Sequence, residues 1–231
     1  MQRVSNSQII LALDVNTLAQ AKRLVNLLYP KIKIFKVGSH LFTAYGPKII
    51  QLLHKKGAQV FLDLKYYDIP NTVAQAVASA VRLKVKMLTL HISGDQAMVE
   101  AAVNAAKNQA KISKTTRPLL IGVTVLTSKK ARPEEIFSLA KNGIAWGLDG
   151  VVCSAQEAAK LRTKIKKKFV IVTPGIRPES CAKDDQKRTA TVSEALKAGS
   201  NFLVIGRPIL KAANPLVAAN EILGDLHGRR N

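Results

Sequence analysis

The sequence alternates, from one end to the other, between short apolar, β-branched runs and longer segments with helical spacing. The eight apolar runs lie at residues 9–15, 32–37, 60–64, 87–92, 119–126, 150–153, 169–172 and 202–205. The helical segments lie at residues 18–28, 47–54, 72–81, 96–107, 134–141, 155–164, 192–198 and 215–223. Strands that alternate with helices pair in parallel through right-handed crossovers. Eight such units in this length predict a closed α/β barrel, the (β/α)8 or TIM barrel, rather than an open doubly wound sheet.

One connection in this series is unusual. The helical segment after the seventh run is short, and residues 180–190 before it are polar, charged and without a hydrophobic period. Long polar loops of this kind often serve enzymes as lids. We therefore expect a mobile loop at residues 180–190.

The size and composition of the chain limit its class. With 231 residues, 47% of them hydrophobic, and no low-complexity linker, we expect one catalytic domain over residues 1–231. The two cysteines, Cys153 and Cys181, suggest neither a disulfide framework nor a metal-binding spacing. We find no targeting segment and no apolar run of membrane-spanning length. These features predict a soluble protein of the reducing cytoplasm, without membrane association.

The chain is strongly basic, with 36 Lys and Arg against 15 Asp and Glu, a formal net charge of +21. Such a charge suggests nucleic acid, an anionic surface or an anionic substrate as partner. The basic residues are scattered, apart from one cluster at residues 164–168, and aromatic residues are not interleaved with it. Because base-stacking surfaces need aromatic rings, we expect a solvated basic surface and no dedicated nucleic-acid site.

The stretch at residues 61–72 places two carboxylates and an ammonium at the end of an apolar run. If residues 61–65 form a strand, Asp63 and Lys65 project from the same face as Phe61, because side chains alternate along a strand. Leu62 and Leu64 then pack on the opposite face.

The charges continue into the following turn. Asp68 lies just past the strand end, and Pro70 suits the first turn of the Ala/Val-rich helix that follows. Strand-to-helix turns are where α/β proteins keep their active sites, so we interpret Asp63, Lys65 and Asp68 as functional. The alternative is an ion-pair ladder that stabilises the strand mouth, since structural networks also gather charges.

Polar side chains end the other predicted strands as well. They are Asp14, Lys36, His91, Ser93, Thr124, Thr127, Ser154, Arg177 and Arg207. We expect His91 and Ser154 to hydrogen-bond neighbouring loops, and Thr124 to be a satisfied buried hydroxyl. The other three histidines lie in helical, loop or tail contexts and indicate no metal site. For Arg207 the structural alternative is a surface pair with Asp184 or Asp185.

Six short motifs follow one another in a specific order and spacing. They occupy residues 11–14, 36–38, 63–72, 124–127, 173–178 and 205–208. Together they resemble the orotidine 5′-phosphate decarboxylase family, over residues 10 to 210. The resemblance implies a (β/α)8 homodimer with shared active sites, without metal or organic cofactor. It also implies conversion of orotidine 5′-phosphate to UMP and CO2, the last step of UMP synthesis.

The same resemblance implies roles for individual residues. Asp14 binds ribose; Lys36, Asp63 and Lys65 line the reaction centre; Asp68 and Thr72 reach into the partner subunit's site; Thr127 borders the nucleotide; Arg177, Gln186, Gly206 and Arg207 hold the phosphate. Gln186 is carried on the expected closing loop.

The residues suit this chemistry independently. Loss of CO2 from C6 of a pyrimidine leaves an sp² carbanion with no adjacent carbonyl, so the protein must act electrostatically. Lys65 can supply the fixed cation and then protonate C6, with Asp63 near the departing carboxylate. Whether Asp63 acts by repelling that carboxylate or by holding the lysines in place stays open at this point.

Two competing functions remain. One is a magnesium-dependent sugar-phosphate decarboxylase or aldolase of the same superfamily, whose second strand carries an acidic metal ligand. Lys36 places an ammonium at that position, which would repel the ion. The other is a non-enzymatic anion-binding protein, which would leave the polar ring at the strand ends unexplained.

Overall fold

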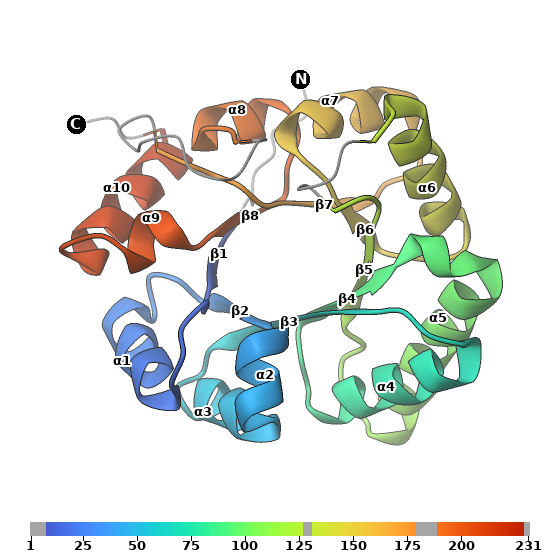
Figure 1. Cartoon of the computed structure of the whole chain (residues 1–231), viewed down its shortest axis with the longest axis horizontal. Helices are drawn as coiled ribbons and strands as arrows, with labels where there is room; N and C mark the ends of the chain where they lie inside the picture. Colours follow the sequence, from blue (N-terminus) through green and yellow to red (C-terminus); the bar gives the residue numbers. More distant parts are fainter. Residues whose placement is uncertain (1–7, 127–130, 179–188, 229–231) are drawn as a thin grey trace.

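The computed structural model describes residues 8–126, 131–178 and 189–228. Within them, eight parallel strands form a closed barrel in sequence order (Figure 1). The strands are β1 (Gln8–Ala12), β2 (Ile34–Gly38), β3 (Gln59–Tyr66), β4 (Met87–His91), β5 (Leu119–Val123), β6 (Gly150–Val152), β7 (Val170–Thr173) and β8 (Phe202–Ile205). Parallel pairing of β1 with β8, Leu11 opposite Ile205, closes the ring. The predicted (β/α)8 fold is confirmed.

Helices surround the barrel on all sides (Figure 1). They are α1 (Leu18–Leu28), α2 (Ser39–Tyr45), α3 (Pro47–Lys55), α4 (Pro70–Arg82), α5 (Asp95–Ile112), α6 (Pro133–Ala145), α7 (Ala155–Lys164), α8 (Val192–Lys197), α9 (Arg207–Leu210) and α10 (Pro215–Leu226), with a short 3-10 helix η1 (Ile92–Gly94). The short helix expected after the seventh strand is α8. Three elements, α2, η1 and α9, were not predicted. None of the helices in the described ranges has the length and apolar character needed to cross a membrane.

Local sequence signals explain where the helices begin. Capping boxes start α1, α7 and α8, and proline occupies the first turn of α3, α4, α6, α9 and α10. At α7 the Ser154 hydroxyl accepts from the Glu157 N–H, and the Glu157 carboxylate accepts from the Ser154 N–H at 2.8 Å. Ser154 thus has a structural role, but it caps its own helix instead of bonding the neighbouring loops that we expected. The prediction of Pro70 in the first turn of α4 is confirmed.

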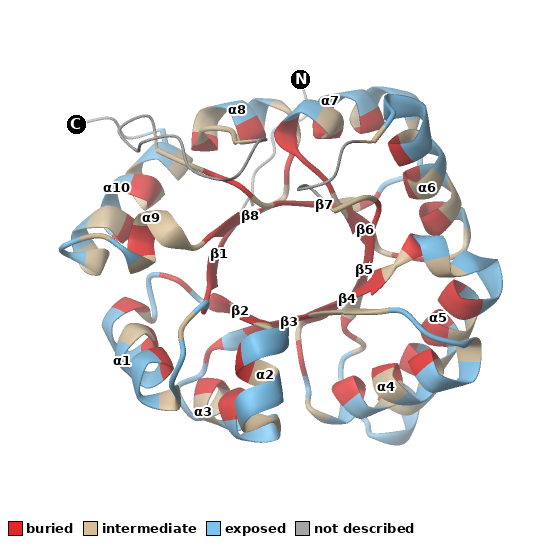
Figure 2. Cartoon of the chain, viewed as in Figure 1, coloured by how far each residue is buried: buried red, intermediate tan, exposed pale blue. Residues whose placement is uncertain are grey.

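The buried apolar residues form two clusters, one inside the barrel and one between the barrel and the helices. Figure 2 shows that buried residues predominate in the strands of the barrel. The inner layer consists of Ile10, Ala12, Ile34, Phe61, Met87, Ile121, Val172 and Val204. Phe61 points inward, whereas Leu62 and Leu64 pack in the outer layer, as the alternation predicted. Four inner residues, Ala12, Phe61, Val172 and Val204, also line the cavity described below. The barrel core thus supports the site directly.

The lysine cluster at residues 164–168 lies at the end of α7 and is partly used in packing against α6. Lys164 Nζ lies 5.2 Å from the Phe137 ring centroid, and Lys167 Nζ donates to the Ile144 carbonyl at 3.0 Å. The expectation of no dedicated nucleic-acid site stays a prediction.

Candidate active site

A cavity of about 250 Å³ opens at the C-terminal ends of the strands, the end at which (β/α)8 enzymes hold their active sites. Its lining divides into two sides. The charged and polar side, from β7 round to β3, includes Asp14, Lys36, Asp63, Lys65, Gly175, Arg177, Gly206 and Arg207. The apolar side, next to β5 and β6, consists of Val123, Val125, Leu126 and Val152. Such an apolar wall excludes water, which strengthens the electrostatic interactions of the charged groups that face it.

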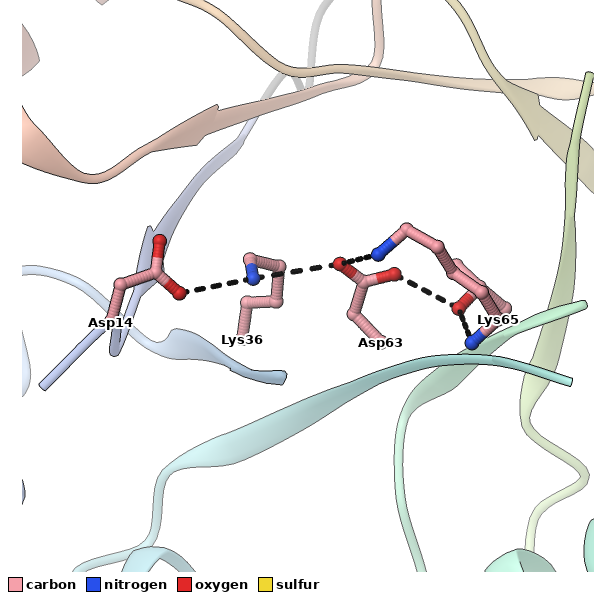
Figure 3. Close-up of polar contacts among 5 residues, drawn as sticks. Asp14, Lys36, Asp63 and Lys65 are labelled. Carbon is pink, nitrogen blue, oxygen red and sulfur yellow. Dashed lines mark hydrogen bonds and ion pairs between the residues drawn. The ribbon is translucent and has the colours of Figure 1, made fainter. Parts of the chain in front are cut away.

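Four charged side chains from the loop after β1 and from the two strands β2 and β3 form an alternating row (Figure 3). Lys36 Nζ lies 3.3 Å from Asp14 Oδ1 and 3.5 Å from Asp63 Oδ2. Lys65 Nζ lies 3.0 Å from the same Asp63 Oδ2. The order is therefore carboxylate, ammonium, carboxylate, ammonium. Of the sequence-predicted site residues, the structure brings Asp14, Lys36, Asp63 and Lys65 into direct contact.

The row is buried most deeply at its centre. The exposed fraction of the side chain is 12% for Asp63 and 13% for Lys36, against 37% for Lys65 and 62% for Asp14. The charges form an ion-pair network, as the structural alternative expected. They also line an open cavity, and the partly exposed Lys65 ammonium is accessible from it. A molecule in the cavity can therefore contact the network.

Asp63 stays ionised despite its burial. Burial alone would raise the pKa of its carboxyl, but the charges of Lys36 and Lys65 and hydrogen bonds from Lys65 and Thr89 outweigh it. The pKa of Asp63 therefore lies below its usual value. The site holds a fixed negative charge between two ammonium groups.

The backbone of β3 departs from a regular strand where the charges lie. Leu62 pairs with Leu88 and Tyr66 with Leu90, so four steps along β3 match two along β4. Lys65 has a φ of 53°, in the left-handed region that side chains other than glycine rarely adopt. This bulge is the local device that lets Asp63 and Lys65 approach each other at the strand end.

Gly38, at the end of β2, makes room for the row. A Cβ atom at this position would lie 3.3 Å from Lys36 Nζ and 4.0 Å from Asp14 Oδ1. A side chain here would press on the ammonium that bridges the two carboxylates. The small residue therefore belongs to the construction of the site.

Two arginines lie on the β7 and β8 side of the cavity. Arg177 follows a turn through Gly175, whose φ is 77°, and its backbone N–H donates to the Ala190 carbonyl at 2.9 Å. Arg207 begins α9 directly after Gly206. Both guanidinium groups thus come from connections that border the charged row, as the sequence predicted, and both line the cavity.

Asp68 and Thr72 lie elsewhere. Neither is among the described residues that line the cavity, and both are exposed. The Asp68 carboxylate accepts the Ile69 N–H at 2.7 Å, and the neighbouring Tyr67 and Ile69 side chains are also exposed. Within one chain these residues do not join the site. Thr127 and Gln186 lie outside the described residues, as do Asp184 and Asp185, which we weighed as partners of Arg207.

Structural roles were expected for two further strand-end residues. The Thr124 hydroxyl donates to the Val152 carbonyl at 3.2 Å and is buried, so that prediction is confirmed. His91 packs edge-on against Tyr67, with ring centroids 5.7 Å apart. It stands outside the cavity lining of the described residues.

Sequence reasoning missed Thr89 in β4. Its hydroxyl lies 2.9 Å from Asp63 Oδ1 and accepts the Lys65 backbone N–H at 2.9 Å. The available signal was a hydroxyl between Leu88 and Leu90 in an apolar run, on the same strand face as His91. The apolar wall of Val125 and Leu126 was missed too, because apolar residues in a loop after a strand carry no distinctive pattern.

Metal ligation does not fit this arrangement. Among the residues that the structure describes, no group of three or more His, Cys, Asp and Glu side chains is placed to hold a metal ion. The side chain between the Asp14 and Asp63 carboxylates is the Lys36 ammonium, which fills the position where a cation would bridge them.

Known proteins resemble this chain over most of its length. The model of the orotidine 5′-phosphate decarboxylase / HUMPS family matches residues 7–222. A Coxiella burnetii protein named orotidine 5′-phosphate decarboxylase is 45% identical over 233 residues, which cover 96% of this chain and 98% of that protein. A Vibrio cholerae protein of the same name is 43% identical over 237 residues, covering 96% and 100%.

Solved structures agree as well. The crystal structure of orotidine 5′-phosphate decarboxylase from Lactobacillus acidophilus superimposes with a TM-score of 0.83 at 34% identity, covering 96% of this chain and 99% of that one. The residues 7–222 that the family model matches include every element that carries a cavity residue. The chain belongs to the orotidine 5′-phosphate decarboxylase / HUMPS family.

Proposed function

We propose that this protein converts orotidine 5′-phosphate to UMP and CO2, the last step of de novo pyrimidine nucleotide synthesis. The observation that carries the proposal is the row Asp14, Lys36, Asp63 and Lys65 at the mouth of the barrel, beside Arg177 and Arg207. The row matches what a carbanion at C6 requires, a fixed cation without a covalent electron sink. The names of the relatives point to the same reaction.

Lys65 is the cation and the proton donor in this proposal. The bond between C6 and the carboxylate breaks, its electron pair stays on C6, and CO2 leaves. The Lys65 ammonium then gives one proton to C6, so that orotidine 5′-phosphate plus a proton becomes UMP plus CO2. Two unit charges about 4 Å apart interact by roughly 4 kcal/mol at an effective dielectric of about 20. A cation held beside C6 therefore contributes usefully to lowering the barrier.

Asp63 could act by repelling the substrate carboxylate or by holding the two lysines in place. The geometry favours the second role. Its Oδ2 lies within 3.5 Å of both lysine Nζ atoms, which holds the two ammonium groups at one place. Repulsion of the substrate carboxylate is compatible with the same position, but it is not needed to explain these two contacts. We assign Asp63 first to holding Lys36 and Lys65.

The remaining residues bind the nucleotide in our proposal. Arg177, Arg207 and the Gly206 backbone hold the phosphate, together with Gln186, while Asp14 binds ribose and Thr127 borders the nucleotide. Arginine suits this role because its planar guanidinium grips two phosphate oxygens. Phosphate binding far from C6 can drive closure of a loop that carries Gln186 and so organise the reacting end.

We further propose a homodimer in which Asp68 and Thr72 complete the site of the partner subunit. Both residues are exposed and stand outside this chain's own cavity lining, and the exposed Tyr67 and Ile69 flank Asp68. Exposed apolar side chains beside functional polar ones mark an interaction surface. A cytoplasmic location belongs to the same proposal, in keeping with the free, buried Cys153.

The test is product formation by the purified protein with two substrates. Orotidine 5′-phosphate in the presence of EDTA should yield UMP and CO2 in equal amounts. A ketose monophosphate with Mg²⁺ should not be converted, because Lys36 stands where a metal ligand would be needed. Turnover of the sugar phosphate alone, or of neither substrate, would overturn the proposal.

A further inference from the structure

We propose that Thr89 is a positioning residue that fixes Asp63 and Lys65 relative to each other. The inference rests on the proposed function, in which these two side chains form the reaction centre. Thr89 lies in the middle of β4, and its residue surface is 0% exposed. It therefore contacts neither solvent nor the cavity, and acts through the two residues that it binds.

The hydrogen-bond arrangement at Thr89 has one consistent direction. A hydroxyl has one proton to donate and two lone pairs with which to accept. Because the Lys65 backbone N–H is a donor, the Thr89 oxygen accepts from it at 2.9 Å. The ionised Asp63 carboxylate can accept only, so the hydroxyl proton is directed to Asp63 Oδ1, at 2.9 Å. One hydroxyl thus joins the carboxylate of Asp63 to the backbone of Lys65.

This link determines which carboxylate oxygen faces the lysines. Oδ1 of Asp63 is occupied by Thr89, and Oδ2 is the oxygen that lies 3.0 Å from Lys65 Nζ and 3.5 Å from Lys36 Nζ. Without the hydroxyl, the carboxylate is free to rotate and share both oxygens between the two ammonium groups. The spacing of the row would then be lost although every charge remained.

The same link holds the bulge in β3. Between Leu62 and Tyr66 the register with β4 shifts, and there the Lys65 N–H donates to a side chain of β4 instead of its backbone. Lys65 also has a φ of 53°, which needs support from its surroundings. Thr89 supplies this support at the residue whose ammonium must reach C6.

The experiment compares two substitutions of nearly equal size. Thr89→Val keeps the shape and removes the hydroxyl, whereas Thr89→Ser keeps the hydroxyl and removes a methyl group. A matched control is Thr173→Val, because Thr173 is also 0% exposed and its hydroxyl lies 2.6 Å from Ser200, outside the charged row. If the Val variant is recovered unfolded, Thr89→Cys replaces it, since a thiol is only a weak donor.

Kinetics on orotidine 5′-phosphate provide the first measurement. For Thr89→Val we expect kcat to fall about 10- to 100-fold with KM little changed, since misplacement by about 1 Å can cost that much. Thr89→Ser should retain most of kcat, and Thr173→Val should keep the wild-type value. A wild-type kcat in the Val variant, or a loss in the Ser variant alone, would show that the methyl group packs and that the hydroxyl does not position.

Titration of the Asp63 carboxyl by ¹³C NMR provides the second measurement, and it needs no turnover. The charged groups that face Asp63 are Lys36 from β2 and Lys65 from β3, with Asp14 beyond Lys36; all remain in the variant. Removing a donor to the charged form should therefore shift the pKa of Asp63 upward. An unchanged pKa would overturn the role of Thr89. If the wild-type protein does not act on orotidine 5′-phosphate, the proposed function fails. The titration still shows whether the Thr89 hydroxyl is bonded to the Asp63 carboxylate.

Discussion

Asp63 is the most constrained residue of the site, since two ammonium groups and one hydroxyl contact its carboxylate. Its pKa lies below the usual 3.8 in the folded protein. Ionised Asp63 thus contributes stability that is fully present above the unfolded-state pKa. That contribution is lost as the pH falls through the lower, folded-state pKa.

A neutral isostere tests this linkage. We expect the difference in unfolding free energy between the wild type and Asp63→Asn to be largest near neutral pH. It should shrink as the pH falls below about 3.8, because the wild-type carboxyl then becomes neutral too. Urea denaturation at a series of pH values measures the difference, with the exposed Asp225→Asn as a control for charge loss. A difference that is constant with pH would mean that the folded state does not favour the ionised form.

At this scale, sequence patterns predicted the charges but not the way they are held. Asp63 and Lys36 stand out because charge at the end of an apolar strand is costly without a role. The shared face of Asp63 and Lys65 is confirmed, yet the regular strand behind that prediction is not, since Lys65 is left-handed. The contact with Thr89 depends on a register shift between two strands, which periodicity within one strand does not contain.

Among the elements, α9 begins at Arg207, directly after β8, and a substitution of this arginine tests phosphate binding. We expect Arg207→Ala to lower kcat/KM for orotidine 5′-phosphate. The loss should correspond to about 2 to 4 kcal/mol of transition-state stabilisation, the scale for a charge-assisted contact in a dry site. The loss should depend on the phosphate. The nucleoside orotidine, which we expect to be a poor substrate because it lacks the phosphate, should be turned over about equally by mutant and wild type.

The matched control for this prediction is Arg23→Ala on α1, which removes the same charge from an exposed surface position. With a net charge of +21, the whole surface attracts an anionic substrate, so one distant charge should change kcat/KM little. An equal loss on orotidine and its phosphate would instead place Arg207 in support of the fold or of the reaction centre.

Elements with strong boundary signals were predicted best. The bounds of α1 and α7 match the predicted 18–28 and 155–164, since capping boxes mark their starts. By contrast, α2 was missed, because its seven residues lie between Gly38 and Gly46 and include Ser, His and Thr, which are poor helix formers. The four-residue α9 is too short for a period to be recognised.

At the scale of the whole molecule, the eightfold alternation predicted the closed barrel because eight βα units in this length leave little choice of architecture. The contribution of a second subunit, by contrast, cannot be derived from the alternation of strands and helices. Asp68 and Thr72 lie outside the cavity lining of their own chain, and one sequence contains no description of how two copies meet. The dimer and the extent of the domain over residues 1–231 therefore stay predictions.

Mixed dimers test the shared site. Asp68→Asn and Lys65→Ala should each be impaired alone. After subunit exchange at equal concentrations, about half of the dimers are mixed, and each has one of two sites with both residues intact, so about one quarter of wild-type activity should return. Labelled subunits confirm that exchange occurs. Exchange without any recovered activity would show that Asp68 does not act across an interface.

The most direct test of the whole account is CO2 release from orotidine 5′-phosphate by the wild type and by Lys65→Ala, side by side in EDTA, with UMP binding measured by calorimetry. The account predicts rapid release by the wild type. It predicts none above the uncatalysed rate for the variant, because cation and proton donor are both lost, while UMP still binds. Near-native release by Lys65→Ala, or no release by the wild type, would contradict the central claim.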